Sequence, residues 1–301
     1  MVTIRSKPAP GPLGLALIFT IGAIWMMARL WSGTGSLAIN LTILLLGLSL
    51  GPCVAAYVLV ARKRKQSLRR LILITGGLSI LTYSFTASAN LDLEGFFQLV
   101  LEGVGGAAVG HTVITLVLGP VVGGRFLCGW GCWRAMVLEL LPVGHGKGRR
   151  SGIWRVLPWA GLAVTFAAAA IGLFVFGHHA GGVPGSRERA GTLAIAGGVA
   201  VYYVAAVGLA VVLKDQRAFC KYLCPSAAIL RLTSRLALVK MTPDPALCNG
   251  CGACSRVCPM DIDVMAFAAR GERVGTGQCI LCQRCAHACP RDALGLTVRR
   301  Q

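Results

Sequence analysis

The chain has 301 residues, of which 55% are hydrophobic and only 14% are charged. Because soluble globular domains carry about a quarter charged residues, this composition excludes an ordinary soluble enzyme and indicates a membrane protein. The net charge of +19 is also typical of proteins that bind nucleic acid. Here, however, the basic residues gather in particular loops between apolar segments, so we expect no nucleic-acid partner and contact with membrane lipid instead.

Six apolar segments are long enough to span a membrane, since a spanning helix needs about 20 predominantly apolar residues. Their interiors contain almost no Lys, Arg, Asp or Glu. In chain order they lie at about 12–31, 38–61, 71–89, 103–124, 156–177 and 190–213. The predicted fold is therefore an all-α polytopic membrane bundle of about six transmembrane helices, followed by a small α+β C-terminal domain.

The charges in the loops predict how the bundle is oriented, because cytoplasmic loops are rich in Lys and Arg. The 62–70 loop holds six such residues and the 125–155 connection holds as many, whereas the 91–97 loop carries Asp92 and Glu94. We therefore expect both termini in the cytoplasm of a bacterial-type cell, with the bundle in the inner membrane. A cleaved signal peptide is the alternative for the first segment, although its length favours a span.

Two pairs of cysteines follow the fourth and sixth segments, at their predicted cytoplasmic ends. Cys128 and Cys132 lie in FLCGWGCW, and Cys220 and Cys224 lie in FCKYLCP. Positions i and i+4 share one face of a helix, so each pair would present two thiols on one side if its segment is helical. Four soft ligands brought together suit a third iron–sulfur centre or a thiolate-bound metal ion. Buried packing and a redox-active dithiol are the alternatives.

The C-terminal part contains most of the thirteen cysteines, and disulfides are rare in the cytoplasm, so metal or redox chemistry is favoured. Residues 248–259 read CNGCGACSRVCP and residues 279–290 read CILCQRCAHACP. Both runs are C-x2-C-x2-C-x3-C-P, in which the fourth cysteine serves the other cluster of a two-cluster ferredoxin. Zinc sites use separated pairs instead. We expect two [4Fe–4S] clusters, one on Cys248, Cys251, Cys254 and Cys289 and one on Cys279, Cys282, Cys285 and Cys258.

Together these motifs resemble a known family. GRFLCGWGCW and FCKYLCPSAA, followed by the double ferredoxin run, resemble the membrane polyferredoxins with paired C-x3-C motifs, such as NapH, the membrane part of NosR, MauN and CcoG. The resemblance covers about residues 96–301. It implies electron transfer with the quinone pool on behalf of a periplasmic or membrane-bound redox partner. The chain departs from the family at Trp133, where proline usually follows the first pair, and it has two more predicted spans than NapH.

Two ionisable residues belong to the fourth predicted segment and are candidates for proton transfer. His111 lies inside the segment and Glu102 lies near its outer end. Ionisable residues at membrane depth are functional candidates, and a quinol releases protons as it loses electrons. A hydrogen bond between helices is the alternative for His111. The predicted catalytic set is Cys128, Cys132, Cys220, Cys224, His111 and Glu102.

We therefore expect a quinol dehydrogenase-like electron-transfer component of an oxidoreductase system. It would pass electrons between the quinone pool, or a membrane or periplasmic partner, and the cytoplasmic clusters. The predicted division is a transmembrane domain at 1–213, a linker with the second cysteine pair at 214–240, and a ferredoxin domain at 241–301. The rival is a metal-handling or assembly factor that acts as a cupric reductase, but the outer loops lack Met-rich or Cys-rich sequence for metal capture.

Overall fold

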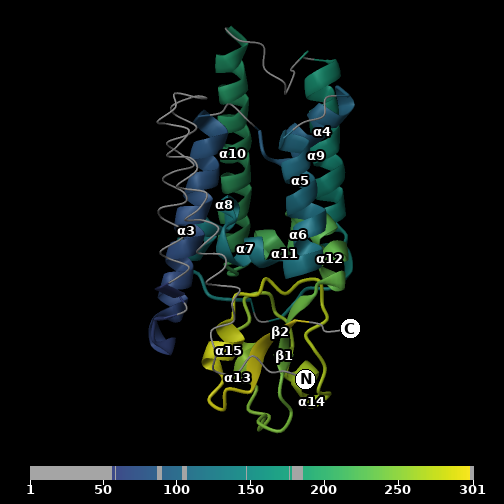
Figure 1. Cartoon of the computed structure of the whole chain (residues 1–301). Coiled ribbons are helices and arrows are strands. Elements are labelled where there is room, and N and C mark those ends of the chain that lie inside the picture. Colours follow the sequence, from purple (N-terminus) through teal and green to yellow (C-terminus); the bar gives the residue numbers. More distant parts are fainter. Residues whose placement is uncertain are drawn as a thin grey trace.

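The helices of this protein stand side by side above a small region that contains two strands (Figure 1). This arrangement comes from a computed structural model. It describes residues 56–57, 59–86, 90–103, 107–146, 148–175, 177 and 186–298. The first predicted membrane segment, at 12–31, and almost all of the second, at 38–61, lie outside the described residues.

Two of the described helices are long and apolar enough to cross a membrane, over Leu157–Phe174 and Ile195–Val212. They belong to α9 (Leu157–Phe174) and α10 (Ser186–Val212), which coincide with the fifth and sixth predicted segments. Their outward side chains are apolar and strongly exposed, for example Val164 at 68% and Val204 at 75%. Such a surface is what a lipid-facing helix presents. Among the described residues, these two helices match predicted spans by length and composition.

The third predicted segment forms α3 (Arg62–Thr86), a long helix that starts within the basic stretch. Its hydroxyl groups are satisfied within the helix, because Thr75, Ser79 and Ser84 each donate to the carbonyl four residues earlier. On the inner face, a Cβ at Gly77 would lie 2.9 Å from the Cα of Trp133. A glycine here therefore allows α3 and α8 (Trp133–Leu140) to pack closely, as small residues do in membrane helices.

The fourth predicted segment is helical but irregular. It consists of α5 (Ala107–Val113), the π-helical turn η1 (Ile114–Leu118) and α6 (Gly119–Gly123). Pro120 has no N–H to donate to the carbonyl of Leu116. That carbonyl instead accepts a hydrogen bond of 3.0 Å from the hydroxyl of Thr233 on α12 (Pro225–Thr233). The irregular turn is therefore satisfied by a neighbouring helix, as buried backbone in a membrane requires.

Residues 90–103 do not form the polar outer loop that their charges suggest. They form α4 (Leu93–Leu101), which packs along α9, and a Cβ at Gly172 of α9 would lie 3.2 Å from the amide of Gln98. Asp92, just before α4, forms an ion pair of 2.7 Å with Arg134 of α8. The charges of the 91–97 and 125–155 segments predicted that these two residues lie on opposite sides of the membrane. The expectation fails because the segment LEGFFQLVL is apolar enough to be buried despite its flanking carboxylates.

The C-terminal region contains a two-stranded antiparallel sheet and short helices. Strand β1 (Val239–Pro243) pairs with β2 (Leu294–Val298), so that Met241 lies opposite Leu296. Three short helices, α13 (Ala253–Arg256), α14 (Val264–Ala269) and α15 (Arg284–Ala288), surround the sheet. The core is formed by Met241, Met260, Ile262, Val264, Val274 and Ile280.

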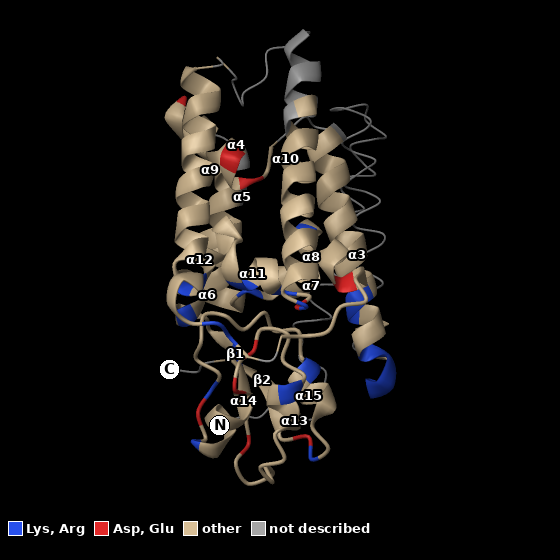
Figure 2. Ribbon diagram, turned by 180° about the vertical axis from the view of Figure 1, so that it is seen from behind, with Lys and Arg blue, Asp and Glu red and all other residues tan. Residues whose placement is uncertain are grey.

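Four further short helices complete the described elements. They are α7 (Phe126–Trp130), η2 (Gly152–Arg155), α11 (Ala218–Tyr222) and η3 (Ser234–Leu236). Two of them, α7 and α11, lie where the bundle meets the C-terminal region (Figure 1). Figure 2 shows Lys and Arg concentrated at this level and at the start of α3, while the long helices are almost free of charge.

Candidate metal centres

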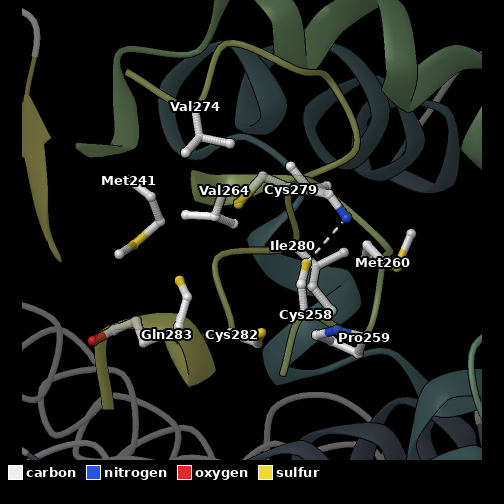
Figure 3. A pocket seen from close by; sticks show the side chains of 12 residues that line it. Met241, Cys258, Pro259, Met260, Val264, Val274, Cys279, Ile280, Cys282 and Gln283 are labelled. Carbon is white, nitrogen blue, oxygen red and sulfur yellow. Dashed lines mark hydrogen bonds between the residues drawn. The ribbon is translucent and has the colours of Figure 1, made fainter. Parts of the chain in front are cut away.

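The first cavity of the C-terminal region is lined by cysteines from both ferredoxin runs. Figure 3 shows the side chains of Cys258, Cys279 and Cys282 around one common space. The cavity has a volume of about 370 Å³, including its open mouth, and the rest of its lining is mainly apolar. We call it the proximal cavity, and its cysteines are Cys258, Cys279, Cys282 and Cys285.

A second cavity, of about 350 Å³ including its mouth, lies at the other end of the region. It is bounded by Pro243 of β1, Met265 of α14 and the loop that leads into α13. We call it the distal cavity, and its cysteines are Cys248, Cys251, Cys254 and Cys289. In both cavities, the cysteines that line the space are the four that the crossed ferredoxin pattern groups together.

The two runs fold in the same way. Each short helix is preceded by a residue in the left-handed conformation, Gly252 at φ 68° before α13 and Gln283 at φ 58° before α15. In each run the backbone N–H four residues after the last cysteine donates to its sulfur at 3.4 Å, to Cys258 in the first and to Cys289 in the second. Such N–H···S contacts stabilise negative charge on sulfur, which a cluster ligand requires.

The thiols of the proximal cavity are buried, and their burial opposes ionisation unless a cation such as iron is bound. Burial raises the pKa of Cys279 to about 12, and it raises the pKa of Cys285 well above 9.0, with Cys282 adding to the rise. Without metal these thiols stay protonated, because several thiolates in an apolar cavity repel one another. Binding of iron must therefore release their protons. The donor set fits an iron–sulfur cluster.

The two predicted cysteine pairs do not lie on continuous helices, contrary to expectation. Cys128 lies in α7, which ends at Trp130, and Cys132 has an extended backbone and begins α8. The second pair has the same arrangement, since Cys220 lies in α11 and Cys224 begins α12 with an extended backbone. Each pair therefore occupies a helix–turn–helix corner. The i, i+4 argument fails because the chain turns between the two cysteines.

These four cysteines, which we call the paired thiols, nevertheless lie near one another. Burial raises the pKa of Cys132 to about 12, and the neighbouring thiols of Cys128, Cys220 and Cys224 contribute to the rise. Within the described ranges, no three His, Cys, Asp or Glu side chains converge closely enough to bind one metal ion, here or in the two cavities. A cubane needs a wider arrangement, because each thiolate binds a different iron of the cage.

An arginine precedes each corner, and no role was predicted for either arginine from the sequence. Arg125 and Arg217 each lie three residues before the first cysteine of a pair, so both corners read R-x2-C-x3-C. Arg125 is only 2% exposed, and its Nη2 lies 4.0 Å from the sulfur of Cys128, while its Nε and Nη1 have no hydrogen-bond partner among the described residues. A buried guanidinium without a carboxylate needs an anion nearby.

The corner with Cys128 packs directly on the proximal cavity. A Cβ at Gly129 would lie 2.4 Å from the carbonyl oxygen of Ile280, so only glycine fits here. The indole Nε1 of Trp130 donates to the carbonyl of Leu281 at 3.0 Å. Ile280 and Leu281 lie between two cysteines of the proximal cavity, Cys279 and Cys282. The paired thiols and the proximal cavity are therefore separated by a single layer of backbone.

A buried carboxylate joins the bundle to the C-terminal region. Glu139 of α8 is 1% exposed and pairs with Arg69 of α3 at 2.5 Å and with Arg217 at 2.6 Å. It also pairs with Arg284 of α15, next to Cys285. Burial alone would raise the pKa of Glu139, but the arginines outweigh it and lower the pKa to about 2. The arginines outnumber the carboxylate, so the junction keeps an excess of positive charge.

The two other predicted catalytic residues belong to different elements from the paired thiols. Glu102 follows the last residue of α4, at the end of the helix opposite to Asp92. His111 belongs to α5, and its side chain is outside the described residues. The structure instead brings Asp92 and Arg134 close to the first cysteine corner. The carboxylates of the 91–97 segment were visible in the sequence, but nothing in their spacing indicated a buried partner.

Comparison with known proteins agrees with this geometry. Residues 240–290 match a 4Fe-4S dicluster domain, and residues 108–150 and 197–242 each match a 4Fe-4S binding domain. The last two segments each contain one cysteine pair. The fold and the cysteine sites thus define a ferredoxin-type protein that holds [4Fe–4S] clusters, as the sequence predicts.

Among curated proteins, the chain is 31% identical over 208 residues to the methylamine utilization ferredoxin-type protein MauN of Methylorubrum extorquens, covering 65% of this chain and 69% of that protein. It is 24% identical to an uncharacterized protein of Methanocaldococcus jannaschii, over 69% of this chain and 78% of that protein. It is 33% identical to the "Putative electron transport protein YccM" of Escherichia coli, over 25% of this chain and 20% of that protein. No solved structure matches.

The chain belongs to the family of 4Fe-4S ferredoxin-type membrane proteins that includes MauN and YccM. The predicted resemblance and the predicted [4Fe–4S] clusters are therefore confirmed. The family places the chain in electron transport, which requires redox partners.

Proposed function

We propose that the chain carries electrons between the quinone pool, or a membrane or periplasmic redox partner, and two cytoplasmic [4Fe–4S] clusters. The observation that carries this proposal is the contact between the Cys128 corner and the loop of the proximal cavity. Gly129 and Trp130 lie directly against Ile280 and Leu281. A redox partner in the membrane could therefore exchange electrons with the ferredoxin domain through the corner itself.

In this proposal each cavity holds one cluster. The proximal cluster is bound by Cys258, Cys279, Cys282 and Cys285, and the distal cluster by Cys248, Cys251, Cys254 and Cys289. The assignment is supported by the cysteines that line each cavity. Cys251 is exposed, so the distal cluster lies closest to a soluble partner, whereas the proximal cluster faces the bundle.

The paired thiols hold a third cluster in this proposal. The support comes from charge. Arg125 is fully buried with two nitrogens unpartnered among the described residues, and Arg217 beside Cys220 is 1% exposed. A cubane with four thiolates is an anion, and it would supply the missing acceptors of Arg125. Arg217 already pairs with Glu139, but a packing role for the four cysteines leaves the buried charge of Arg125 unexplained.

The proposed topology has six spans with both termini in the cytoplasm. It assigns residues 1–213 to the membrane domain, 214–240 to a linker and 241–301 to the ferredoxin domain. The support is the coincidence of α9 and α10 with predicted segments and the belt of Lys and Arg beside the C-terminal region. This places all three proposed centres at the cytoplasmic end of the bundle, in the inner membrane.

The test is reduction of the purified, anaerobically prepared protein by a quinol analogue, followed by visible and EPR spectroscopy of the clusters. We expect reduction in the native protein. In Cys128→Ser, quinol should no longer reduce the two ferredoxin clusters, although dithionite still does. The matched control is Cys53→Ser, which removes a cysteine outside every motif. If no quinol reduces the clusters and no reduced cluster passes electrons to quinone, the proposal is wrong.

A further inference from the structure

A group of polar side chains lies half-way along the bundle, where the long helices are otherwise apolar. It consists of Asp92, Glu94, Arg134 and Tyr202, and we call it the mid-bundle cluster. Asp92 and Glu94 stand at the beginning of α4, which Figure 2 shows starting well below the tops of α9 and α10. A Cβ at Gly198, in the middle of α10, would lie 3.4 Å from an oxygen of Glu94. Ionisable groups at such depth are rare and functional by default.

Arg134 is the centre of this cluster. Its Nη2 donates to Asp92 at 2.7 Å, and its guanidinium lies 4.0 Å from the ring centre of Tyr202 and 4.6 Å from that of Trp133. Asp92 does not cap α4, although it occupies the cap position. The carboxylate is thus used for the ion pair with Arg134 and not for the helix.

Two polar groups of the cluster are buried, since Arg134 is 6% exposed and Tyr202 is 8% exposed. Both side chains are therefore more than nine-tenths buried, whereas the side chain of Asp92 in the same site is 17% exposed. The Nε of Arg134 has no hydrogen-bond partner among the described residues, and the hydroxyl of Tyr202 lies beside Glu94. Unpaired buried polar groups are costly, so a site that keeps them is suited to exchanging a hydrogen-bonding partner.

The charges of the cluster do not balance. Two carboxyl groups, Asp92 and Glu94, share one guanidinium. Among the described residues, the other helices packed against them add no compensating base. Helix α10 contributes Tyr202 and Tyr203, and α9 contributes no titratable side chain. The side chain of His111 in α5 lies outside the described residues. Two adjacent carboxyl groups in a low-dielectric site cannot both stay ionised easily, so they can share a proton.

We propose that Asp92 and Glu94 bind one proton together with each electron that reaches the paired thiols. Arg134 connects the two sites, since it follows Cys132 by two residues and pairs with Asp92. The hydroxyl of Tyr203 donates to the carbonyl of Trp133 at 3.1 Å and fixes the corner between them. Electron arrival adds negative charge beside Arg134, which weakens its hold on Asp92 and favours protonation of the carboxyl pair.

The step is balanced. Reduction would add one electron to the cluster that the paired thiols hold in the proposed function, and one proton from the donor would form an O–H bond on the carboxyl pair; reoxidation releases both. In the cell the donor of electron and proton is the quinol of the proposed function, on which this inference rests. In the experiment the donors are a chemical reductant and water.

The experiment is a potentiometric titration of the third centre between pH 6 and pH 9, followed by EPR. One proton per electron lowers the midpoint potential by about 59 mV per pH unit, the potential equivalent of a tenfold change for a one-electron couple. We expect this slope in the native protein and a nearly flat line in Glu94→Gln and in Asp92→Asn. A second readout is the carbonyl band of a protonated carboxyl group in redox-induced infrared difference spectra, which Glu94→Gln should remove.

The control is Glu272→Gln, which removes one carboxylate from the exposed ion pair with Arg270 in the ferredoxin domain. It should keep the full slope. Iron content and the potentials of the two ferredoxin clusters report whether each variant folds normally. A flat line in the native protein, or an unchanged slope in both variants, overturns the inference while leaving the third centre in place. Absence of a third centre overturns both the centre and the inference.

Discussion

At the scale of single residues, Glu139 shows how the molecule uses buried charge. One carboxylate from α8 receives arginines from α3, from the linker before the second cysteine pair and from α15. Lys221 has the same role nearby, bridging Asp215 at 2.7 Å and Asp261 of the C-terminal region at 2.5 Å. These two ionic junctions hold the ferredoxin region against the bundle. The Glu139 junction, with three arginines on one carboxylate, also leaves positive charge beside the proposed clusters.

Glu139→Gln should weaken this junction strongly. The substitution leaves Arg69, Arg217 and Arg284 buried without their carboxylate, and removing one partner of a buried pair costs about 3–5 kcal/mol. We expect a lower free energy of unfolding in detergent, measured by denaturant titration with the cluster absorbance as probe. Glu272→Gln, which breaks an exposed pair, should change it by less than about 1 kcal/mol. Equal effects of the two substitutions would show that Glu139 does not hold the junction.

The buried histidine His145 should make the stability of the junction depend on pH. Burial, together with the neighbouring charges of Arg284 and Lys221, lowers the pKa of His145 to about 4. The unfolded chain has a histidine pKa of about 6.5 and therefore binds more protons between about pH 6.5 and pH 4. Stability should accordingly fall as the pH decreases through this window.

The measurement is the unfolding midpoint in denaturant at pH 7.5 and at pH 5.5, for the native protein and for His145→Gln. The variant cannot be protonated at this position, so its midpoint should depend less on pH. Identical pH dependence in both proteins would mean that the pKa of His145 does not change on folding, which would contradict this prediction.

At the scale of elements, the cysteine corners are where the sequence was partly misleading. Spacing alone identified both pairs and suggested a shared site if the helices bring them together. It could not reveal that Cys132 and Cys224 begin new helices, because an i, i+4 pair and a helix–turn–helix corner have the same spacing. Pro225 after the second pair was the available signal, since proline is favoured in the first turn of a helix. Trp133 occupies the same place in the first corner, so no such signal existed there.

Gly129→Ala in α7 tests whether this corner transmits electrons. The added methyl group would lie 2.4 Å from the backbone oxygen of Ile280, so the loop of the proximal cavity must move away. We expect a loss of stability of about 1–3 kcal/mol and slower reduction of the ferredoxin clusters by quinol. The rate is measured by stopped-flow absorbance.

Gly131→Ala is the matched control for this prediction. Its φ of −153° lies outside the left-handed region, and the nearest atom to an added Cβ is 4.0 Å away. In this variant, quinol should reduce the ferredoxin clusters at the native rate. A native rate in Gly129→Ala would show that electrons reach the ferredoxin region by another route.

At the scale of the whole molecule, a repeated motif indicated which distant residues meet, whereas isolated charged residues did not indicate their partners. The eight ferredoxin cysteines follow from two copies of one spacing, and the structure groups them around two cavities in the predicted sets. The burial of α4 and the ion pair of Asp92 with Arg134 depend on contacts between segments far apart in the chain. The charge rule for loops assumes that carboxylates stay in water, and that assumption fails where a buried arginine compensates them.

The account depends most on the third centre, because it links the bundle to the ferredoxin region and the mid-bundle cluster to redox change. Its most direct test is the iron content per polypeptide after anaerobic purification. Two cubanes contain about eight irons and three contain about twelve. We predict about twelve in the native protein and about eight when Cys128 and Cys220 are both changed to serine. A native protein that holds about eight irons, unchanged by these substitutions, would contradict the account.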